Sequence, residues 1–337
     1  MNFRKRYLLL LIFVSQFSFS QEGIAVYSDY LSDNLYLLHP SMAGASSCTK
    51  VRVTGRQQWF DVENAPRLQT ASFNARVGEQ SGVGAILFSD RNGYHSQTGI
   101  KATYAHHIMF SRSDYDLNQL SFGMSGALVQ SQLDETDFIG PDQPFDPNIG
   151  GQIGKFNYFN VDVGASYFYL DYFAHFTVKN VIANMRREIY TDFESDNLRK
   201  FIFSTGYVFG TDQSLQVEPS MMYQFTEQTN EQMIDLNLKL YKEFESGKVW
   251  GGLSYRRSFD GAQFVDPSNA NSRVQNQRLQ YVTPILGVNF KQFMVSYTYS
   301  YLTGNVRFDN AGFHQITLGL DLFCSKKRWN CNCPAIN

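Results

Sequence analysis

Apolar and polar residues alternate with a period of two along most of the chain, from about residue 48 onward. In one segment near the C-terminus, Phe293, Val295, Tyr297, Tyr299 and Tyr301 are separated mostly by Ser and Thr. Successive side chains of a β-strand point to opposite faces, so this alternation predicts strands with one apolar and one polar face. The sequence therefore predicts an all-β protein.

The length of the alternating segments separates two kinds of β-protein. They run for about ten residues or more, which is the span of a tilted membrane strand and longer than the usual strand of a soluble sandwich. About fourteen strands are expected, an even number, as single-chain bacterial outer-membrane barrels have. Their expected bounds are 48–58, 67–77, 81–90, 97–109, 117–131, 158–169, 171–181, 198–209, 214–226, 232–244, 248–259, 277–289, 291–302 and 312–323.

The lengths of the connections between these segments depend on whether the preceding strand is odd- or even-numbered. Those after even-numbered strands are short, and the longest of them covers residues 110–116. Those after odd-numbered strands include every long one: 131–157, 180–197, 261–276 and 303–311. Outer-membrane barrels have short periplasmic turns and long extracellular loops, whereas a soluble sandwich has no reason to follow this parity. The sequence predicts a transmembrane antiparallel up-and-down β-barrel with both termini in the periplasm.

The N-terminus has the layout of a secretory signal. Arg4, Lys5 and Arg6 precede an apolar run over 7–14, and a small residue, Ser20, stands before a plausible cleavage point. The apolar run is too short to span a bilayer as a helix. Residues 1–20 are therefore expected to be a cleaved signal peptide through which the chain is exported, and the outer membrane is the expected location of the barrel.

The rest of the chain divides into three parts. Residues 21–47 carry aromatic residues but no strand-length alternation, so this segment is a candidate plug of the barrel or a periplasmic segment. Residues 48–323 form the expected barrel, and residues 324–337 form a Cys-containing periplasmic tail.

Composition adds two constraints. The chain has 29 Phe and 20 Tyr, an aromatic fraction of 15%, which is typical of aromatic girdles at membrane interfaces. The formal net charge of −2 excludes a bulk attraction to nucleic acid, and outer-membrane lipid is the expected surrounding.

Charged residues on the polar faces carry both signs. An ion-selective pore would tend toward one sign, so mixed signs favour internal salt bridges and a filled lumen. The expected lumen charges are Arg52, Arg56, Lys101, Asp162, Glu218, Asp235, Lys239, Arg256 and Asp321.

The four cysteines allow a pairing hypothesis. Cys48 opens the first strand and Cys324 follows the last strand on the same side of the barrel. First and last strands are neighbours in a closed barrel, so a disulfide across the seam is possible in an oxidising compartment. Cys331 and Cys333 are competing partners, because four cysteines permit three pairings and the sequence alone does not choose.

No pattern of residues indicates catalysis. The chain has no Ser nucleophile elbow, zinc-protease helix motif or phosphate-binding loop. His106 and His107 point to opposite faces of one strand and cannot form one chelate. The loop 131–157 holds Asp134, Glu135, Asp137, Asp142 and Asp146, but their spacing is not that of an EF-hand, so Ca²⁺ binding is a weaker reading than a solvated loop. We expect no enzyme activity, no metal and no cofactor.

Several motifs together resemble the PorP/SprF family of type IX secretion system membrane proteins. His39-Pro40-Ser41-Met42-Ala43-Gly44 is similar to the family's N-P-A-[YM]-A-G box. Residues 56–59, RQQW, and 64–73, NAPRLQTASF, are similar to its R-x-Q-W and A-P-x-x-Q-T-x-S-F stretch. Residues 167–173 resemble its central Y-Y-x-D-x-F hairpin.

The resemblance implies an outer-membrane role in type IX secretion. One branch of the family associates with periplasmic ring and peptidoglycan-binding subunits of the machine. The other pairs with secreted adhesins, some used in gliding motility, by receiving a C-terminal sorting domain and anchoring the product or helping its export. Residues expected at the outer rim for such contacts are Trp59, Phe60, Phe138, Phe145 and Phe264. An outer-membrane transporter for a hydrophobic or small solute is the alternative function.

Overall fold

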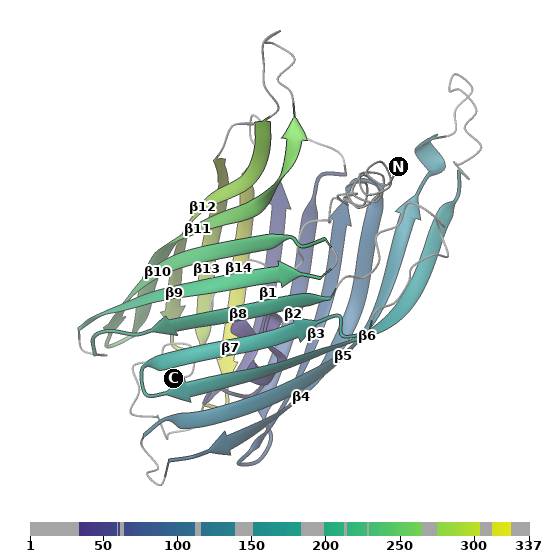
Figure 1. Ribbon diagram of the computed structural model, residues 1–337. Helices are drawn as coiled ribbons and strands as arrows, with labels where there is room; N and C mark the ends of the chain where they lie inside the picture. Colours follow the sequence, from purple (N-terminus) through teal and green to yellow (C-terminus); the bar gives the residue numbers. More distant parts are fainter. Residues whose placement is uncertain are drawn as a thin grey trace, which may run out of the picture.

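The computed structural model describes residues 34–58, 60, 64–111, 116–138, 151–182, 199–211, 214–227, 229–264, 275–303 and 312–324. These residues form the antiparallel barrel that the sequence predicts, with fourteen strands, each paired with its neighbours in the chain and β1 paired with β14 (Figure 1). The strands are β1 (Thr49–Gln58), β2 (Arg67–Arg76), β3 (Ser81–Asn92), β4 (His95–Met109), β5 (Asn118–Asp134), β6 (Ile153–Tyr169), β7 (Tyr172–Lys179), β8 (Lys200–Tyr207), β9 (Leu215–Thr226), β10 (Gln232–Phe244), β11 (Gly247–Phe264), β12 (Gln275–Phe290), β13 (Phe293–Thr303) and β14 (Phe313–Leu322).

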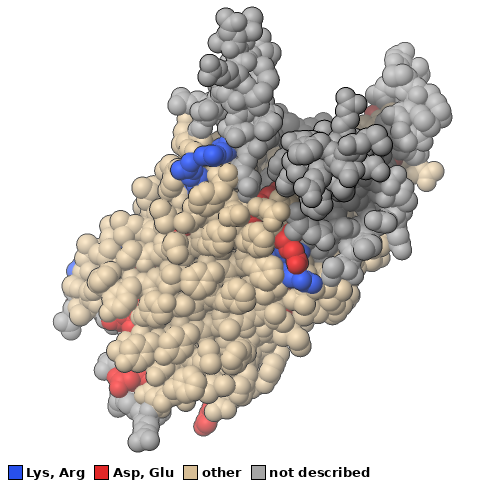
Figure 2. Space-filling model, viewed as in Figure 1, with Lys and Arg blue, Asp and Glu red and all other residues tan. Residues whose placement is uncertain are grey.

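The distribution of polarity is the reverse of that in a soluble protein. Large apolar side chains such as Leu87, Leu128 and Leu286 are exposed on the outer surface, while Thr, Ser and charged residues on the alternate positions are buried inside. Figure 2 shows a broad outer band almost without charged side chains, with Lys, Arg, Asp and Glu near its margins. An apolar outer band is what lipid contact requires of a barrel. Among the described residues, no helix is long and apolar enough to cross a bilayer.

The two ends of the barrel differ. At one end, called the turn end here, lie Cys48, Cys324 and the tight turns such as Leu170-Asp171 between β6 and β7. At the opposite end, called the loop end, the strands stop at unequal heights. The β5–β6 and β11–β12 hairpins rise beyond their neighbours, and the rim is lower along β7 to β10 between them (Figure 1).

Several expected strand bounds were wrong. Strand β11 runs to Phe264 and β12 begins at Gln275, so their connection covers 265–274 rather than 261–276. The largest difference lies between β5 and β6. The sequence placed a loop over 131–157, but β5 continues to Asp134 and β6 begins at Ile153, so the connection covers only 135–152. The alternation changes phase near Tyr158. From Phe159 to Val163 the apolar residues occupy the odd-numbered positions and face outward. In 153–158 the aromatic residues Phe156 and Tyr158 instead occupy even-numbered positions, and polar Lys155 and Asn157 occupy the odd ones. The apolar face of the strand is therefore interrupted at Tyr158, which is where the sequence pattern placed the start of the strand.

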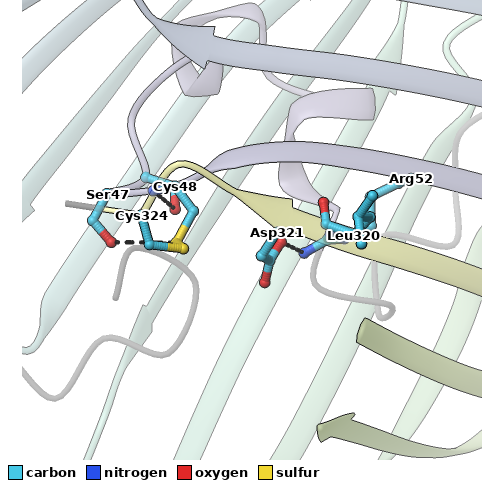
Figure 3. Close-up of a disulfide and its surroundings, with 7 residues drawn as sticks. Ser47, Cys48, Arg52, Leu320, Asp321 and Cys324 are labelled. Atoms are coloured by element: carbon cyan, nitrogen blue, oxygen red, sulfur yellow. Dashed lines mark hydrogen bonds and ion pairs between the residues drawn. A yellow bond between two sulfur atoms is a disulfide. The ribbon is translucent and has the colours of Figure 1, made fainter. Parts of the chain in front are cut away.

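A disulfide joins Cys48 to Cys324 across the seam, with a Cα–Cα distance of 4.0 Å (Figure 3). It continues the β1–β14 pairing, which begins at Thr49↔Leu322 and runs to Gln58↔Phe313. The bond links residues 276 positions apart in sequence and therefore fixes the closure of the barrel at the turn end.

We expect the double variant Cys48→Ser/Cys324→Ser to fold but to lose about 2–4 kcal/mol of stability, because the cross-link restricts the unfolded chain. Urea unfolding of the purified barrel in detergent, with and without reductant, measures this loss. Peptide mapping by mass spectrometry under non-reducing conditions should show the peptide of Cys48 bound to that of Cys324. A Cys48 peptide bound instead to Cys331 or Cys333 would contradict the assignment.

Candidate functional site in the barrel lumen

Residues 34–47, called the plug here, lie inside the barrel rather than along its wall. They form two short 3-10 turns, η2 (Leu35–Leu37) and η3 (Pro40–Met42), and η3 packs against β4, β5 and β6. Pro40 starts η3 because its fixed φ suits the first position of a helical turn, and His39 before it is extended, as a residue preceding proline tends to be. His39, Ser41 and Ala43 have no exposed surface.

Polar groups attach the plug to several strands at once. Asn34 donates through its side-chain amide to the Ser72 hydroxyl on β2 at 3.0 Å. The Tyr36 hydroxyl donates to Thr103 on β4 at 2.7 Å, and burial raises the pKa of Tyr36 to about 12, so it stays protonated as a donor. Buried polar groups are stable only when they are hydrogen-bonded. These bonds therefore fix the segment in one position.

His39 lies at the centre of the plug. Its Nδ1 is 2.8 Å from Thr177 Oγ1 on β7, and its Nε2 is 3.0 Å from Ser204 Oγ on β8. The ring also stacks on His175 of β7, with ring centroids 4.8 Å apart. Complete burial, with His175 and Lys179 nearby, holds the pKa of His39 well below its usual value. A neutral imidazole has one donor and one acceptor, which matches the two hydroxyl partners.

Backbone carbonyls of the plug also have partners on the wall. Lys179 of β7 donates to the Leu37 carbonyl at 3.2 Å, and the Arg76 guanidinium of β2 donates to the Gly44 carbonyl at 3.0 Å. His107 Nε2 lies 3.0 Å from the Ala43 carbonyl oxygen. The irregular backbone of the plug is not paired with a neighbouring strand, so side chains of the wall provide the hydrogen bonds that its carbonyl groups need.

Glycines in the wall leave room for the plug backbone. A Cβ on Gly123 of β5 would collide with the backbone of Pro40 and Ser41, and a Cβ on Gly82 of β3 would collide with the Ala43 carbonyl. A Cβ on Gly84 would meet the Tyr36 hydroxyl. Glycine is the residue that permits such close approach of a second backbone. The wall is therefore shaped for this segment.

Charged residues inside the barrel form ion pairs of opposite sign. Eight of the nine lumen charges singled out in the sequence lie in four pairs, and the ninth, Arg56, stacks over the ring of Phe313 at 3.9 Å. Figure 3 shows the first pair beside the seam. The pairs are Arg52–Asp321, Lys101–Asp162, Lys239–Glu218 and Arg256–Asp235.

The Arg256–Asp235 pair predicts a measurable loss of stability. Two of the three guanidinium nitrogens of Arg256, Nε and Nη2, donate to the two carboxylate oxygens at 2.6 Å each, and the Asp235 side chain is 1% exposed. Asp235→Leu should destabilise the barrel by about 3–5 kcal/mol, because it leaves a buried charge unpaired. The double variant Asp235→Leu/Arg256→Met should recover most of this loss. Urea unfolding of the three proteins tests it; equal loss in the single and double variants would show that the charge is solvated instead.

The aromatic residues expected to form a partner surface do not share one contact. The Phe60 ring packs edge-on against His314 of β14 at 5.2 Å, whereas Phe138, in η4 (Thr136–Phe138), packs against Tyr94 at 4.5 Å. Trp59 and Phe145 lie outside the described residues, as does the side chain of Phe264. These residues remain a hypothesis for partner binding.

The acidic loop is only partly described. Asp134 ends β5, Glu135 follows it and Asp137 lies in η4. Asp142 and Asp146 fall outside the described residues. In the part of the chain that the structure describes, no group of three or more His, Cys, Asp or Glu is placed to hold a metal ion.

Sequence reasoning considered His107 only to exclude a metal chelate with His106, and it missed the other wall residues that receive the plug. His107 and His175 are buried and hydrogen-bonded to Ser121 and Ser166, respectively. Gly123 and Gly82 could not be identified from the sequence, because a glycine in a strand does not indicate whether a second segment of backbone packs against it. The only available signal was the frequency of small hydroxyl residues on the polar faces of β4 to β8.

Comparisons with known proteins agree with this architecture. A family profile described as "Type IX secretion system membrane protein PorP/SprF" matches residues 19–320. A search of curated proteins finds no significant match.

Solved structures match in fold. The CymD monoaromatic hydrocarbon channel superposes with a TM-score of 0.50 at 9% identity, over 89% of this chain and 94% of that one. The translocator domain of autotransporter NalP from Neisseria meningitidis gives a TM-score of 0.31 at 10% identity, over 82% and 88%. Salmonella typhi OmpF gives 0.35 at 9%, over 81% and 97%. The likeness to CymD, at this identity, concerns the barrel fold alone.

Proposed function

The chain belongs to the type IX secretion system membrane protein PorP/SprF family, and from this premise we propose that it binds a secreted protein through that protein's C-terminal sorting domain. The barrel anchors this product at the cell surface or helps its export, as for adhesins of the gliding type. It works as an outer-membrane β-barrel that holds a partner, and no step of catalysis is involved.

The plug is the observation that carries this proposal. An open pore for small polar solutes needs a continuous aqueous path, whereas here His39, Ser41 and Ala43 are buried between β3, β4, β5, β7 and β8. The four internal ion pairs tie β1 to β14, β4 to β6, β9 to β10 and β10 to β11. Both features make the wall rigid, and rigid walls are suited to presenting a binding surface on their loops.

The loop end supplies the binding surface in this proposal. The raised β5–β6 and β11–β12 hairpins stand on either side of the lower β7–β10 rim (Figure 1). A partner seated there would contact strands rather than only loops, and strands hold a site more rigidly than loops do. The loop end is assigned to the cell exterior because outer-membrane barrels place their longer connections there.

Two other readings compete with this proposal. A channel for a hydrophobic or small solute would need the plug to leave the lumen. A structural component of the secretion machine would bind periplasmic ring or peptidoglycan-binding subunits at the turn end instead. Each of these two readings predicts a different effect of losing this protein on the secreted proteins than the proposed function does.

Deletion of the gene for this protein in its own organism tests the proposal. Secreted proteins with C-terminal sorting domains are quantified on the cell surface, in the periplasm and in the medium. We expect one or a few of them to disappear from the surface, while the others remain and the wild-type chain restores them. Loss of all such proteins at once would favour a machine component, and no change in any of them would contradict a role in cargo handling.

A further inference from the structure

Strand β6 has a stretch near the loop end where only one of its two edges is paired. Strand β5 pairs with β6 along its whole length, from Asp134↔Ile153 to Asn118↔Tyr169. Strand β7 pairs with β6 only from Val163 onward. A bond from the Val181 N–H to the Val161 carbonyl, and two bonds between the Ile182 backbone and the Asn160 side chain, extend that contact as far as Asn160. In the described part of the chain, no strand lies beside the other edge of residues 153–157.

The hydrogen-bond phase identifies the groups that face this open edge. The Glu135 N–H donates to the Gln152 carbonyl, so this pair is hydrogen-bonded. Hydrogen-bonded and non-hydrogen-bonded pairs alternate in an antiparallel ladder, so residues 154 and 156 point their backbone groups toward β5. Ile153, Lys155 and Asn157 then point theirs away from β5, and these backbone groups have no hydrogen bond within the described residues.

The open edge lies beyond the apolar band. On the outer face of the β5–β6 hairpin, Leu128 and Phe159 are exposed, as lipid contact requires. The next pair toward the loop end is polar, since Gln130 donates to the Asn157 side chain at 3.1 Å. Unpaired backbone groups cannot face hydrocarbon but are tolerated in water, where they are also available for pairing with another chain.

Side chains around the edge define the chemistry of a matching strand. Lys155, Asn157 and the apolar Ile153 are exposed on the outer face. Phe156, which stacks on Tyr158 with ring centroids 6.1 Å apart, lies on the inner face. An incoming strand would place alternate residues on these two faces. It would therefore suit an apolar residue beside Phe156 and an acidic residue beside Lys155.

We propose that the 153–157 edge of β6 receives an extended strand of the secreted partner by β-strand addition. The proposal rests on the proposed function and specifies how the partner is held. Backbone groups of Ile153, Lys155 and Asn157 supply binding, while Lys155 supplies selection, because a charged edge disfavours strands that lack an opposite charge.

A proline substitution distinguishes the contribution of the Lys155 backbone to partner binding from that of its side chain. The full-length protein is purified from its own membranes as Lys155→Pro, Lys155→Ala and wild type, and the co-purifying protein with a sorting domain is quantified. Proline removes one edge-facing N–H and inserts a ring there, but leaves the pairing with β5 intact, since residue 155 does not donate to β5. We expect Lys155→Pro to lower partner recovery about tenfold or more, and Lys155→Ala to lower it about threefold or less.

Folding of each variant is checked by the Cys48–Cys324 disulfide, and Ile153→Pro provides a second edge variant with the same expected loss. A photo-crosslinking residue at Ile153 of the otherwise unchanged chain should crosslink to the partner, and one at lipid-facing Leu286 should not. Full recovery of partner by folded Lys155→Pro and Ile153→Pro would overturn the edge proposal while leaving the proposed function intact. A crosslink from position 153 to the chain's own residues 183–198 would also overturn it. Wild type that recovers no secreted protein would overturn both.

Discussion

Replacement of residues 34–45 by a Gly/Ser segment of equal length is expected to give a barrel that conducts ions, whereas the wild-type barrel is expected not to conduct. The plug is hydrogen-bonded inside the barrel to β2, β4, β6, β7 and β8, through Asn34, Tyr36, His39 and Ser41. A flexible Gly/Ser chain lacks the side chains that make these contacts. The wall behind them is lined by hydroxyl groups that water can solvate. Conductance of the purified protein in a planar lipid bilayer measures the change.

Two controls belong with this experiment. The replacement keeps Ser46, Ser47 and Cys48, so formation of the seam disulfide reports that the barrel has closed. A Ser47→Ala variant, altered next to the seam but outside the buried contacts, should remain closed. A folded replacement variant that still does not conduct would show that the wall side chains close the lumen without the plug.

The second large effect is expected from Gly123→Val. The added side chain would meet the backbone of Pro40 and Ser41, and backbone cannot move aside as a flexible side chain does. Overpacking typically destabilises by about 1–3 kcal/mol, and here release of the plug is the route that relieves it. Urea unfolding measures the stability, and labelling of a cysteine placed at Ser41 with a membrane-impermeant thiol reagent measures release of the plug, in a background with Cys331 and Cys333 replaced by Ser.

Gly55→Val is the matched control for this substitution. Gly55 lies on the outer face of β1, and a Cβ there would meet no atom within 4 Å. It should leave stability and the protection of position 41 unchanged. Equal labelling of position 41 in Gly123→Val and in Gly55→Val would contradict the docked position of η3.

The strands could be predicted because lipid imposes a simple rule on them. Residues such as Val295 and Tyr297 of β13 must face outward, and their neighbours Ser296 and Thr298 must face inward, so a period of two is visible in the sequence. The rule applies only within the apolar band. Beyond it, Lys155 and Asn157 face outward, and the sequence pattern no longer distinguishes the start of β6 from a loop.

The interior site could be predicted only in outline. Mixed charge on the inward positions indicated internal ion pairs, but the partner of each charge depends on register between strands far apart in sequence, as for Lys101 and Asp162. The plug was visible as a segment without alternation. Its docking on Gly123 and its bonds to Thr177 and Ser204 depend on three-dimensional placement that no local pattern encodes.

The central claim is that this outer-membrane barrel holds a secreted partner rather than conducting a solute. Its most direct test is purification of the tagged protein from its own membranes in mild detergent, with quantification of the co-purifying chains by mass spectrometry. The account predicts a secreted protein with a C-terminal sorting domain in near-stoichiometric amount. Recovery of the barrel alone, together with ion conductance of that wild-type preparation in a bilayer, would contradict it.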